Sequence, residues 1–223
     1  MFKGYSNEED EEEDHSQMIV KPDSYLEKSD KPIFGVGHQM DSHTNETVWK
    51  VGKFLSTGKC VTIIDTQGMQ DTENRTCKFT REIGQVVRQL GEIDAFVLLF
   101  KADTTRLTNV VKEQLNTFQQ LFGKRFWKRA LIQITFFSHD KRSRRRRKGK
   151  RDMDQIKKGW EDTLKKKMLV PYDVPVIFID SVIDDGYAED FEIKTFKEET
   201  EKLLNFTKNG EPYVCSDVTC KGQ

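Results

Sequence analysis

Four clusters of apolar residues, each of a length typical of a β-strand, recur along the chain from about Ile33 onward. Segments with apolar residues every three or four positions, the spacing of one face of an α-helix, separate these clusters. Strands that are apolar at nearly every position are typical of a parallel sheet with helices on both faces. The pattern therefore predicts an α/β domain with three layers and a mostly parallel sheet. Its expected strands are Val61–Ile64, Ala95–Phe100, Ala130–Phe137 and Val174–Ile179.

The expected helices follow from the apolar stripes between these strands. Gly123 stands where the second helix should stop, because glycine is common just past a helix C-terminus. A further strand, Trp49–Leu55, is expected to pair antiparallel with Val61–Asp65 across a turn. Trp127 and Trp160 are expected to be core or helix-packing residues. The helical stripes span Phe79–Leu90, Leu107–Phe122, Met153–Leu164 and Ile193–Leu204.

Charge and composition limit the classes of ligand and the cellular location that the sequence allows. Lys plus Arg equals Asp plus Glu, at 37 each, so no overall field favours nucleic acid or anionic lipid. The acidic run Glu8–Asp14 predicts a disordered tail over residues 1–30, and residues 210–223 are expected to form a C-terminal tail. The longest apolar run, Ala95–Phe100, is far shorter than the roughly 20 residues of a transmembrane helix. The acidic start is unlike a secretory signal, so we expect a cytoplasmic protein with unpaired thiols.

The stretch Val61–Gly68 carries the clearest chemical pattern. A buried strand delivers Asp65 and then Gly68 at its carboxyl end, where ligands bind in open α/β sheets. An aspartate there can hold Mg²⁺ through water, and a glycine lets its backbone N–H approach a terminal phosphate closely. The pattern favours a nucleotide site over a structural turn.

Three motifs together resemble the G domain of the GIMAP/IAN family, the avirulence-induced-gene type of GTPase. They are Asp65–Gly68 followed by Asp71–Arg75, then Phe100–Lys101, then Leu121–Lys128. The resemblance runs from about Ile33 to Asn209 and is nearest to invertebrate members. It implies a P-loop-GTPase-like G domain over residues 31–209, GTP or GDP and Mg²⁺ as ligands, a role in immunity-associated settings, and a homodimer formed through the G domain.

Carried across position by position, the resemblance assigns five nucleotide-binding residues. Asp65 and Gly68 match the Mg²⁺ and γ-phosphate motif, and Thr44 resembles the switch threonine, so Asp65 and Thr44 are the expected metal ligands. Asp140 resembles the residue that accepts from guanine N1 and N2, and Ser181 matches the last base-contacting loop. The family usually has a polar residue where Phe136 stands, which leaves base specificity open.

The phosphate loop is the main departure from the family. A P-loop needs GxxxxGK[ST] between a strand and a helix, and this sequence contains no such segment. The near match Gly52–Cys60 has the wrong spacing, ends in cysteine and precedes a strand, so it is rejected. The first strand and phosphate loop are therefore expected to be missing or replaced, which should open a seam between the strands that end at Asp65 and at Phe100. Met69 also stands where Ras-like enzymes keep a water-orienting glutamine.

Two functional hypotheses follow. The first is a guanine-nucleotide-binding protein with impaired binding and hydrolysis, so that GTPase activity stays an open question. The alternative is a non-catalytic pseudo-GTPase that acts as a dimerising interaction or scaffold protein.

The basic segment Lys141–Arg151, nine of whose eleven residues are cationic, is predicted as an insertion in the domain. It can be a solvated loop, a contact for an acidic partner, RNA or anionic lipid, or a nuclear-targeting signal. Nucleic acid is disfavoured because no aromatic residue interleaves with the arginines. The four histidines show no metal-binding spacing and are expected to be satisfied or exposed. They are His15, His38, His43 and His139.

Overall fold

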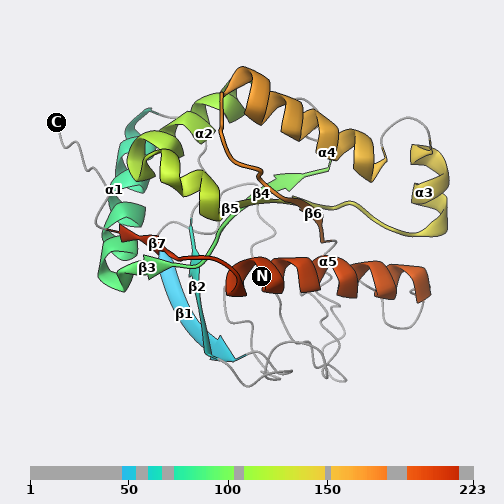
Figure 1. The fold of residues 1–223 in the computed structure, drawn as a ribbon, viewed down its shortest axis with the longest axis horizontal. Helices are drawn as coiled ribbons and strands as arrows, with labels where there is room; N and C mark the ends of the chain where they lie inside the picture. The colour runs from blue at the N-terminus through green and yellow to red at the C-terminus, as the bar shows by residue number, and fades with distance from the viewer. Residues whose placement is uncertain are drawn as a thin grey trace. The chain divides into compact units, whose positions relative to one another are not determined.

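The computed structural model describes residues 47–53, 60–66, 73–102, 108–148, 152–179 and 190–215 (Figure 1). It consists of two compact units. The first comprises residues 1–83 and 181–188, and the second comprises residues 84–180 and 189–223. Each unit is described by itself below. The predicted residues Thr44, Gly68, Met69 and Ser181, and the acidic run Glu8–Asp14, lie outside the described residues.

The first unit contains a pair of antiparallel strands, β1 (Val48–Lys53) and β2 (Cys60–Asp65). Val48 pairs with Asp65 and Lys53 with Cys60, so the predicted antiparallel pairing is confirmed. Gly52 lies inside β1 and Cys60 begins β2, which places the near match to a P-loop between two paired strands. Helix α1 (Glu73–Leu90) begins in this unit and ends in the second, where Val87 is buried.

The second unit is built on a parallel sheet whose described strands run in the order β4 (Phe96–Lys101), β5 (Ala130–Thr135) and β6 (Val176–Phe178). Phe96 pairs with Ala130, and Ile134 pairs with both Phe100 and Phe178. Five of the six residues of β5 are buried, as a central strand requires. The parallel α/β sheet predicted from the apolar clusters is thus confirmed.

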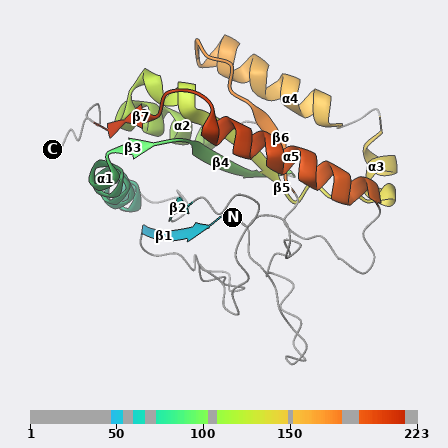
Figure 2. The ribbon, with the colours of Figure 1, turned by 60° about the horizontal axis from the view of Figure 1, so that its bottom comes forward.

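Helices cover this sheet on both sides, and together they make the three layers expected from the sequence (Figures 1 and 2). Helices α2 (Asn109–Phe122) and α4 (Met153–Asp162) lie on one side of the sheet, and α5 (Asp190–Lys208) lies on the other. A 3-10 helix, η1 (Lys124–Arg129), leads into β5, and a π-helical turn, η2 (Thr163–Lys167), extends α4. Thr108 caps α2, whose end falls at Gly123 as predicted, with φ of 71°.

Aromatic rings fill the core between α2, η1 and β4. The ring centroid of Phe96 lies 4.9 Å from that of Phe122 and 5.0 Å from that of Phe126. Tyr213 closes the cluster, because its hydroxyl donates to the Phe122 carbonyl at 2.7 Å. Trp127 is fully buried and Trp160 almost so, which confirms that both tryptophans belong to the core.

A buried arginine ties η1 to the end of α5. The Arg129 side chain donates to the carbonyl oxygens of Asp94, Phe206, Thr207 and Asn209, three of which lie at the C-terminus of α5. Helix C-termini leave carbonyls without intrahelical partners, and a cation there also complements the helix dipole. Arg129 therefore fixes the end of α5 against the start of β5.

Three features differ from the sequence prediction. The basic segment is not only a loop, since Lys141–Arg147 form helix α3. Strand β4 is not buried on both faces, because Val97 is 37% exposed and Leu99 59% exposed. The predicted C-terminal tail begins as a strand, β7 (Tyr213–Val214), which pairs antiparallel with β3 (Glu92–Ile93).

Each difference has a local cause. Arginine has a high helix propensity and Asp140 supplies an N-cap, so α3 forms despite its like charges. Strand β4 is an edge of the described sheet, and only the face that carries Leu98 and Phe100 is covered. On that face the ring centroids of Phe100 and Trp160 lie 4.6 Å apart. The described part of the chain contains no helix that is both long enough and apolar enough for a membrane span.

Candidate nucleotide-binding site

Asp65 and Asp140 are the two predicted site residues that the structure describes. Asp65 is the last residue of β2 and is partly buried. Asp140 follows β5 and begins α3. Asp65 belongs to the first unit and Asp140 to the second, so the position of each is described within its own unit only. Asp140 stands just past the carboxyl end of β5 in the parallel sheet, where open α/β sheets bind ligands, whereas the strand of Asp65 is described only in its antiparallel pair with β1.

The carboxylate of Asp140 is held by hydrogen bonds on both of its oxygens. The Ser138 hydroxyl donates to Oδ2 at 2.6 Å, and the Ser143 backbone N–H donates to Oδ1 at 2.8 Å as the N-cap of α3. These bonds hold the pKa of Asp140 well below its usual range, with Ser138 the larger cause. The side chain is therefore ionised at neutral pH and fixed in orientation.

An ionised carboxylate has about four acceptor positions on its two oxygens. Besides these two bonds, the Ser143 side chain and the Arg142 backbone N–H also donate to the carboxylate, so a ligand with paired N–H donors has to displace some of these local donors. A carboxylate of this kind can accept two parallel N–H donors from one planar ring edge. Guanine offers such a pair at N1 and N2, and adenine does not.

Phe136 occupies an unusual backbone conformation directly after β5. Its φ is 55°, in the left-handed region that few residues other than glycine adopt. Its side chain is 67% exposed, and the Lys101 ammonium lies 5.5 Å from the ring centroid. Backbone strain of this kind is concentrated at functional sites. The sequence marked Phe136 only as a departure from the family, whereas the structure shows it as an exposed aromatic ring just past the carboxyl end of β5.

The backbone around Phe136 is anchored on both sides. The Ala102 N–H donates to the Thr135 carbonyl at 2.8 Å, which continues the pairing of β4 with β5 past the last strand residue. On the other side, Phe137 is buried and packs on Phe178 of β6, with ring centroids 4.7 Å apart. The segment between β5 and α3 is thus held in place at both ends.

His139 departs from the expectation that the histidines are satisfied or exposed. It is only 4% exposed, and its Nε2 atom has no hydrogen-bond partner among the described residues. Burial lowers the pKa of His139, the nearby charge of Arg147 lowers it further, and a hydrogen bond with the Phe178 backbone opposes the shift. The imidazole is therefore neutral at pH 7. Its burial depends on Phe137, β6 and α3, so no pattern in the sequence could have indicated it.

A buried carboxylate on α5 holds the end of β6. Glu199 is 2% exposed, and its Oε2 accepts from the Phe178 backbone N–H at 2.8 Å, while Oε1 pairs with Lys202. Strand β6 is therefore attached to α5 by a charged group as well as by packing. This contact fixes the strand end beside His139.

Comparison with known proteins shows which family the chain belongs to. The AIG1 family model matches residues 30–152, which is more than half of the chain and includes Asp65, Gly68 and Asp140. The chain belongs to the AIG1 family. This confirms the resemblance to the GIMAP/IAN, avirulence-induced-gene type of G domain. No curated protein sequence matches this AIG1 chain significantly.

Solved structures of Toc33 from Arabidopsis thaliana share the fold of this AIG1 protein. A dimerization-deficient R130A mutant of Toc33 aligns with a TM-score of 0.60 at 15% identity, covering 83% of this chain and 78% of that chain. Toc33 in complex with Mg²⁺ and GMPPNP aligns with a TM-score of 0.55 at 16% identity over the same shares. A third structure comes from work on the chloroplast translocon components atToc33 and psToc159, in which dimerization is described as important for GTPase activity. It aligns with a TM-score of 0.54 at 15% identity, covering 81% of this chain and 76% of that chain. These likenesses confirm the P-loop-GTPase-like α/β fold.

Proposed function

We propose that this AIG1 protein is a guanine-nucleotide-binding G domain whose ligands are GTP or GDP with Mg²⁺. The observation that carries the proposal is the AIG1 match over residues 30–152, which contains both described candidate residues, Asp65 and Asp140. The chemistry of Asp140 supports it, because an ionised, oriented carboxylate suits the paired N–H donors of guanine. The Toc33 complexes with GMPPNP or GDP and Mg²⁺ support the same ligands through a shared fold.

Each candidate residue has a proposed role. Asp140 accepts from guanine N1 and N2, and Ser181, which follows β6 in the sequence, contacts the base. Asp65 and Thr44 hold Mg²⁺, with Asp65 acting through water, and the backbone N–H of Gly68 meets the γ-phosphate. The exposed ring of Phe136 offers a face on which the base can stack, a contact that is tolerant of base identity. Specificity for guanine then rests on Asp140.

Affinity for the triphosphate is expected to be weak in this chain. Without GxxxxGK[ST], the nucleotide loses backbone and lysine contacts, and charge-assisted hydrogen bonds of this type are worth roughly 1.5–3 kcal/mol each. The loss of even two such bonds turns a micromolar dissociation constant into one on the order of a millimolar. Hydrolysis is expected to be impaired as well, because Met69 stands in place of a water-orienting glutamine.

The substitution Asp140→Asn tests the proposed base contact without removing the helix cap, because asparagine and aspartate are equally good N-cap residues. An amide offers one acceptor and one donor, so it mismatches guanine but matches xanthine, which has N1–H beside a C2 carbonyl. Ligand-observed NMR at millimolar nucleotide suits the weak affinity. We expect Asp140→Asn to lose GTP and to gain XTP. Unchanged preference for GTP in this variant would refute the role of Asp140.

The matched control is Lys124→Ala, an exposed substitution in η1 that should leave both nucleotides unaffected. If Asp140→Asn and Lys124→Ala behave alike, the guanine contact lies elsewhere in the chain.

The alternative function is that of a non-catalytic, dimerising interaction protein. The absence of GxxxxGK[ST] from the sequence favours it. Dimerization is described as important for the GTPase activity of Toc33 and psToc159, and we propose that this chain also forms a homodimer through its G domain. Sedimentation analysis separates the two functions when it is run with and without GTP and Mg²⁺. A dimer whose stability is independent of nucleotide supports the alternative, whereas a dimer that forms only with nucleotide supports the first function.

A further inference from the structure

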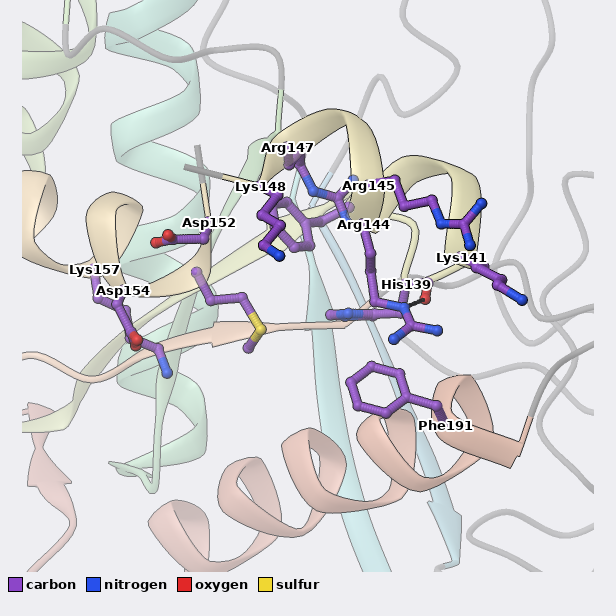
Figure 3. Close-up of a pocket in the computed structure, with 12 residues that line it drawn as sticks. His139, Lys141, Arg144, Arg145, Arg147, Lys148, Asp152, Asp154, Lys157 and Phe191 are labelled. Atoms are coloured by element: carbon purple, nitrogen blue, oxygen red, sulfur yellow. Dashed lines mark hydrogen bonds between the residues drawn. The ribbon is translucent and has the colours of Figure 1, made fainter. Parts of the chain in front are cut away.

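A cavity of about 900 Å³ lies in the second unit between α3, the start of α4 and the start of α5 (Figure 3). Its volume falls within the range of small-molecule sites, about 300–1,000 Å³. Phe137, Met153 and Phe191 provide its apolar lining. The cavity stands beyond the carboxyl end of β5, and none of the residues assigned to the nucleotide lines it.

Cations dominate the polar lining of this cavity. Two carboxylates also face it, but Asp152 already accepts from the Gln155 backbone N–H at 2.9 Å as the N-cap of α4. Lys141, Arg145 and Lys148 have no ion pair among the described residues. Like charges gathered around one cavity repel one another and raise the local concentration of anions. The cationic lining residues are Lys141, Arg144, Arg145, Arg147, Lys148 and Lys157.

Two of the guanidinium groups are fixed in place by aromatic rings. Arg144 lies 4.1 Å from the ring centroid of Phe191, and its Nε donates to the His139 carbonyl at 2.7 Å. Arg147 lies 3.8 Å from the ring centroid of Phe137 and donates to the Ser138 carbonyl. A planar guanidinium that is already oriented loses little entropy on binding and matches the geometry of a phosphate group.

His139 adds a buried polar atom to the same cavity. It lines the cavity and is 4% exposed, yet its Nε2 has no hydrogen-bond partner among the described residues. Leaving such a group unsatisfied costs about 1–3 kcal/mol. A ring N–H already donates to the Phe178 backbone, so Nε2 of the neutral ring is an acceptor. A phosphate oxygen accepts from Nε2 once the ring has taken up a proton, and binding is therefore coupled to protonation of His139. Figure 3 shows His139, Arg144 and Phe191 gathered on one side of the cavity.

We propose that this cavity binds a compact polyanion that carries several phosphate groups. The oriented arginines contact one phosphate beside His139, and the lysines and Arg145 neutralise the others. An extended single-stranded RNA fits less well, because the two rings that could stack on bases are covered by Arg144 and Arg147. The phosphate groups can belong to a soluble molecule or to a lipid headgroup, and the binding chemistry is the same for both.

The test uses the full chain and three probes at about 0.15 M salt, where surface attraction is screened over roughly 8 Å. Inositol hexakisphosphate is titrated by calorimetry, vesicles containing phosphatidylinositol 4,5-bisphosphate by sedimentation, and a single-stranded RNA by fluorescence anisotropy. We expect saturable one-to-one binding of the soluble probe. If the chain also binds the vesicles, a lipid headgroup can carry the phosphate groups. If it binds only the soluble probe, the ligand is a soluble molecule. Both outcomes support the site.

Paired variants separate the cavity from general charge. Arg145→Ala with Lys148→Ala removes two exposed cavity cations, and Lys124→Ala with Lys197→Ala removes two exposed cations outside the cavity. We expect the first pair to raise the dissociation constant at least tenfold and the second to change it less than twofold. Because both pairs remove exposed side chains, folding is expected to be intact and is checked by circular dichroism.

NMR of the His139 ring supplies an independent readout. A bound polyanion opposes the charges of Arg147 and Arg144, so the ring should titrate at higher pH in the complex, with Glu199 as the other facing charge. Four results would overturn the proposal: no saturable binding, equal losses in the two variant pairs, tighter binding of RNA than of the phosphate probe, or stoichiometric displacement by GTP with Mg²⁺. The last result would make the cavity part of the nucleotide site, whereas loss of nucleotide binding alone would leave the proposal standing.

Discussion

The cap of α3 can be tested by the substitution Asp140→Ala. The seven residues of α3 include none that is buried, so this helix depends on its ends and on the Arg144 and Arg147 contacts. Alanine removes the bond from the Ser143 N–H to Oδ1 and the bond from the Ser138 hydroxyl to Oδ2. Loss of an N-cap side chain costs about 0.5–2 kcal/mol. Water can replace the partner of the half-exposed Ser138, so we expect a total near the middle of that range.

The cost should appear as local opening of α3. A segment with little buried surface opens below the free energy of global unfolding. Hydrogen exchange of the Arg144 and Lys148 amides, which donate to the carbonyls of Asp140 and Arg144, should therefore accelerate in Asp140→Ala by roughly 2- to 30-fold. Urea denaturation should show a loss in the free energy of unfolding of the same order, about 0.5–2 kcal/mol, as long as α3 is closed in the native state. Asp140→Asn is the control and should keep the protection, because asparagine also caps helices.

The pH dependence of this protection has a defined sign. The pKa of Asp140 is lower in the folded chain than in the unfolded chain, so its stabilisation is present above the ordinary carboxyl pKa of about 4. The stabilisation is lost only as the pH falls below that value toward the folded pKa. Equal exchange rates in wild type and Asp140→Ala at pH 7, or equal loss in Asp140→Asn, would refute the capping argument.

Three further substitutions test contacts that position the site. Arg129→Met leaves the α5 carbonyls without their buried donor. The free energy of unfolding, measured by urea denaturation, should fall by about 3 kcal/mol or more. A fall of less than about 1 kcal/mol would contradict the role of Arg129. Glu199→Ala orphans the buried Phe178 N–H and should cost about 1–3 kcal/mol in the same assay, and a neutral result would contradict it. In Gly123→Ala the new methyl group meets no atom within 4 Å, but alanine is forced to φ of 71° and ψ of 175°, a region that is essentially restricted to glycine. We therefore expect backbone strain alone to cost about 1–3 kcal/mol and to lower the melting temperature by several degrees. An unchanged melting temperature would show that this turn relaxes.

Apolar spacing predicted most of the fold because burial decides it. The residues of β5 are buried almost throughout, and the pairing of β1 with β2 followed from two strand-like runs around a turn. Gly123 marked the end of α2 for a conformational reason that acts within a few residues. Such local and periodic signals are present in the sequence itself.

The candidate site could be predicted less well from such local patterns. The charges of α3 were compatible with a solvated loop, whereas in the folded chain the cap at Asp140 and the aromatic rings beside Arg144 and Arg147 support a helix. Arg144 and Phe191 are far apart in sequence, so their contact requires the sheet that brings α3 and α5 together. The burial of His139 and the backbone conformation of Phe136 likewise depend on tertiary structure.

Recognition of guanine by this chain can be measured by saturation-transfer NMR with GTP and ATP, each at millimolar concentration with Mg²⁺, because the method detects weak binding. We expect transfer to the guanine H8 proton, little transfer to adenine, and loss of the guanine signal in Asp65→Ala or without Mg²⁺. Equal transfer to both bases, or no transfer to GTP from a folded chain, would contradict guanine recognition.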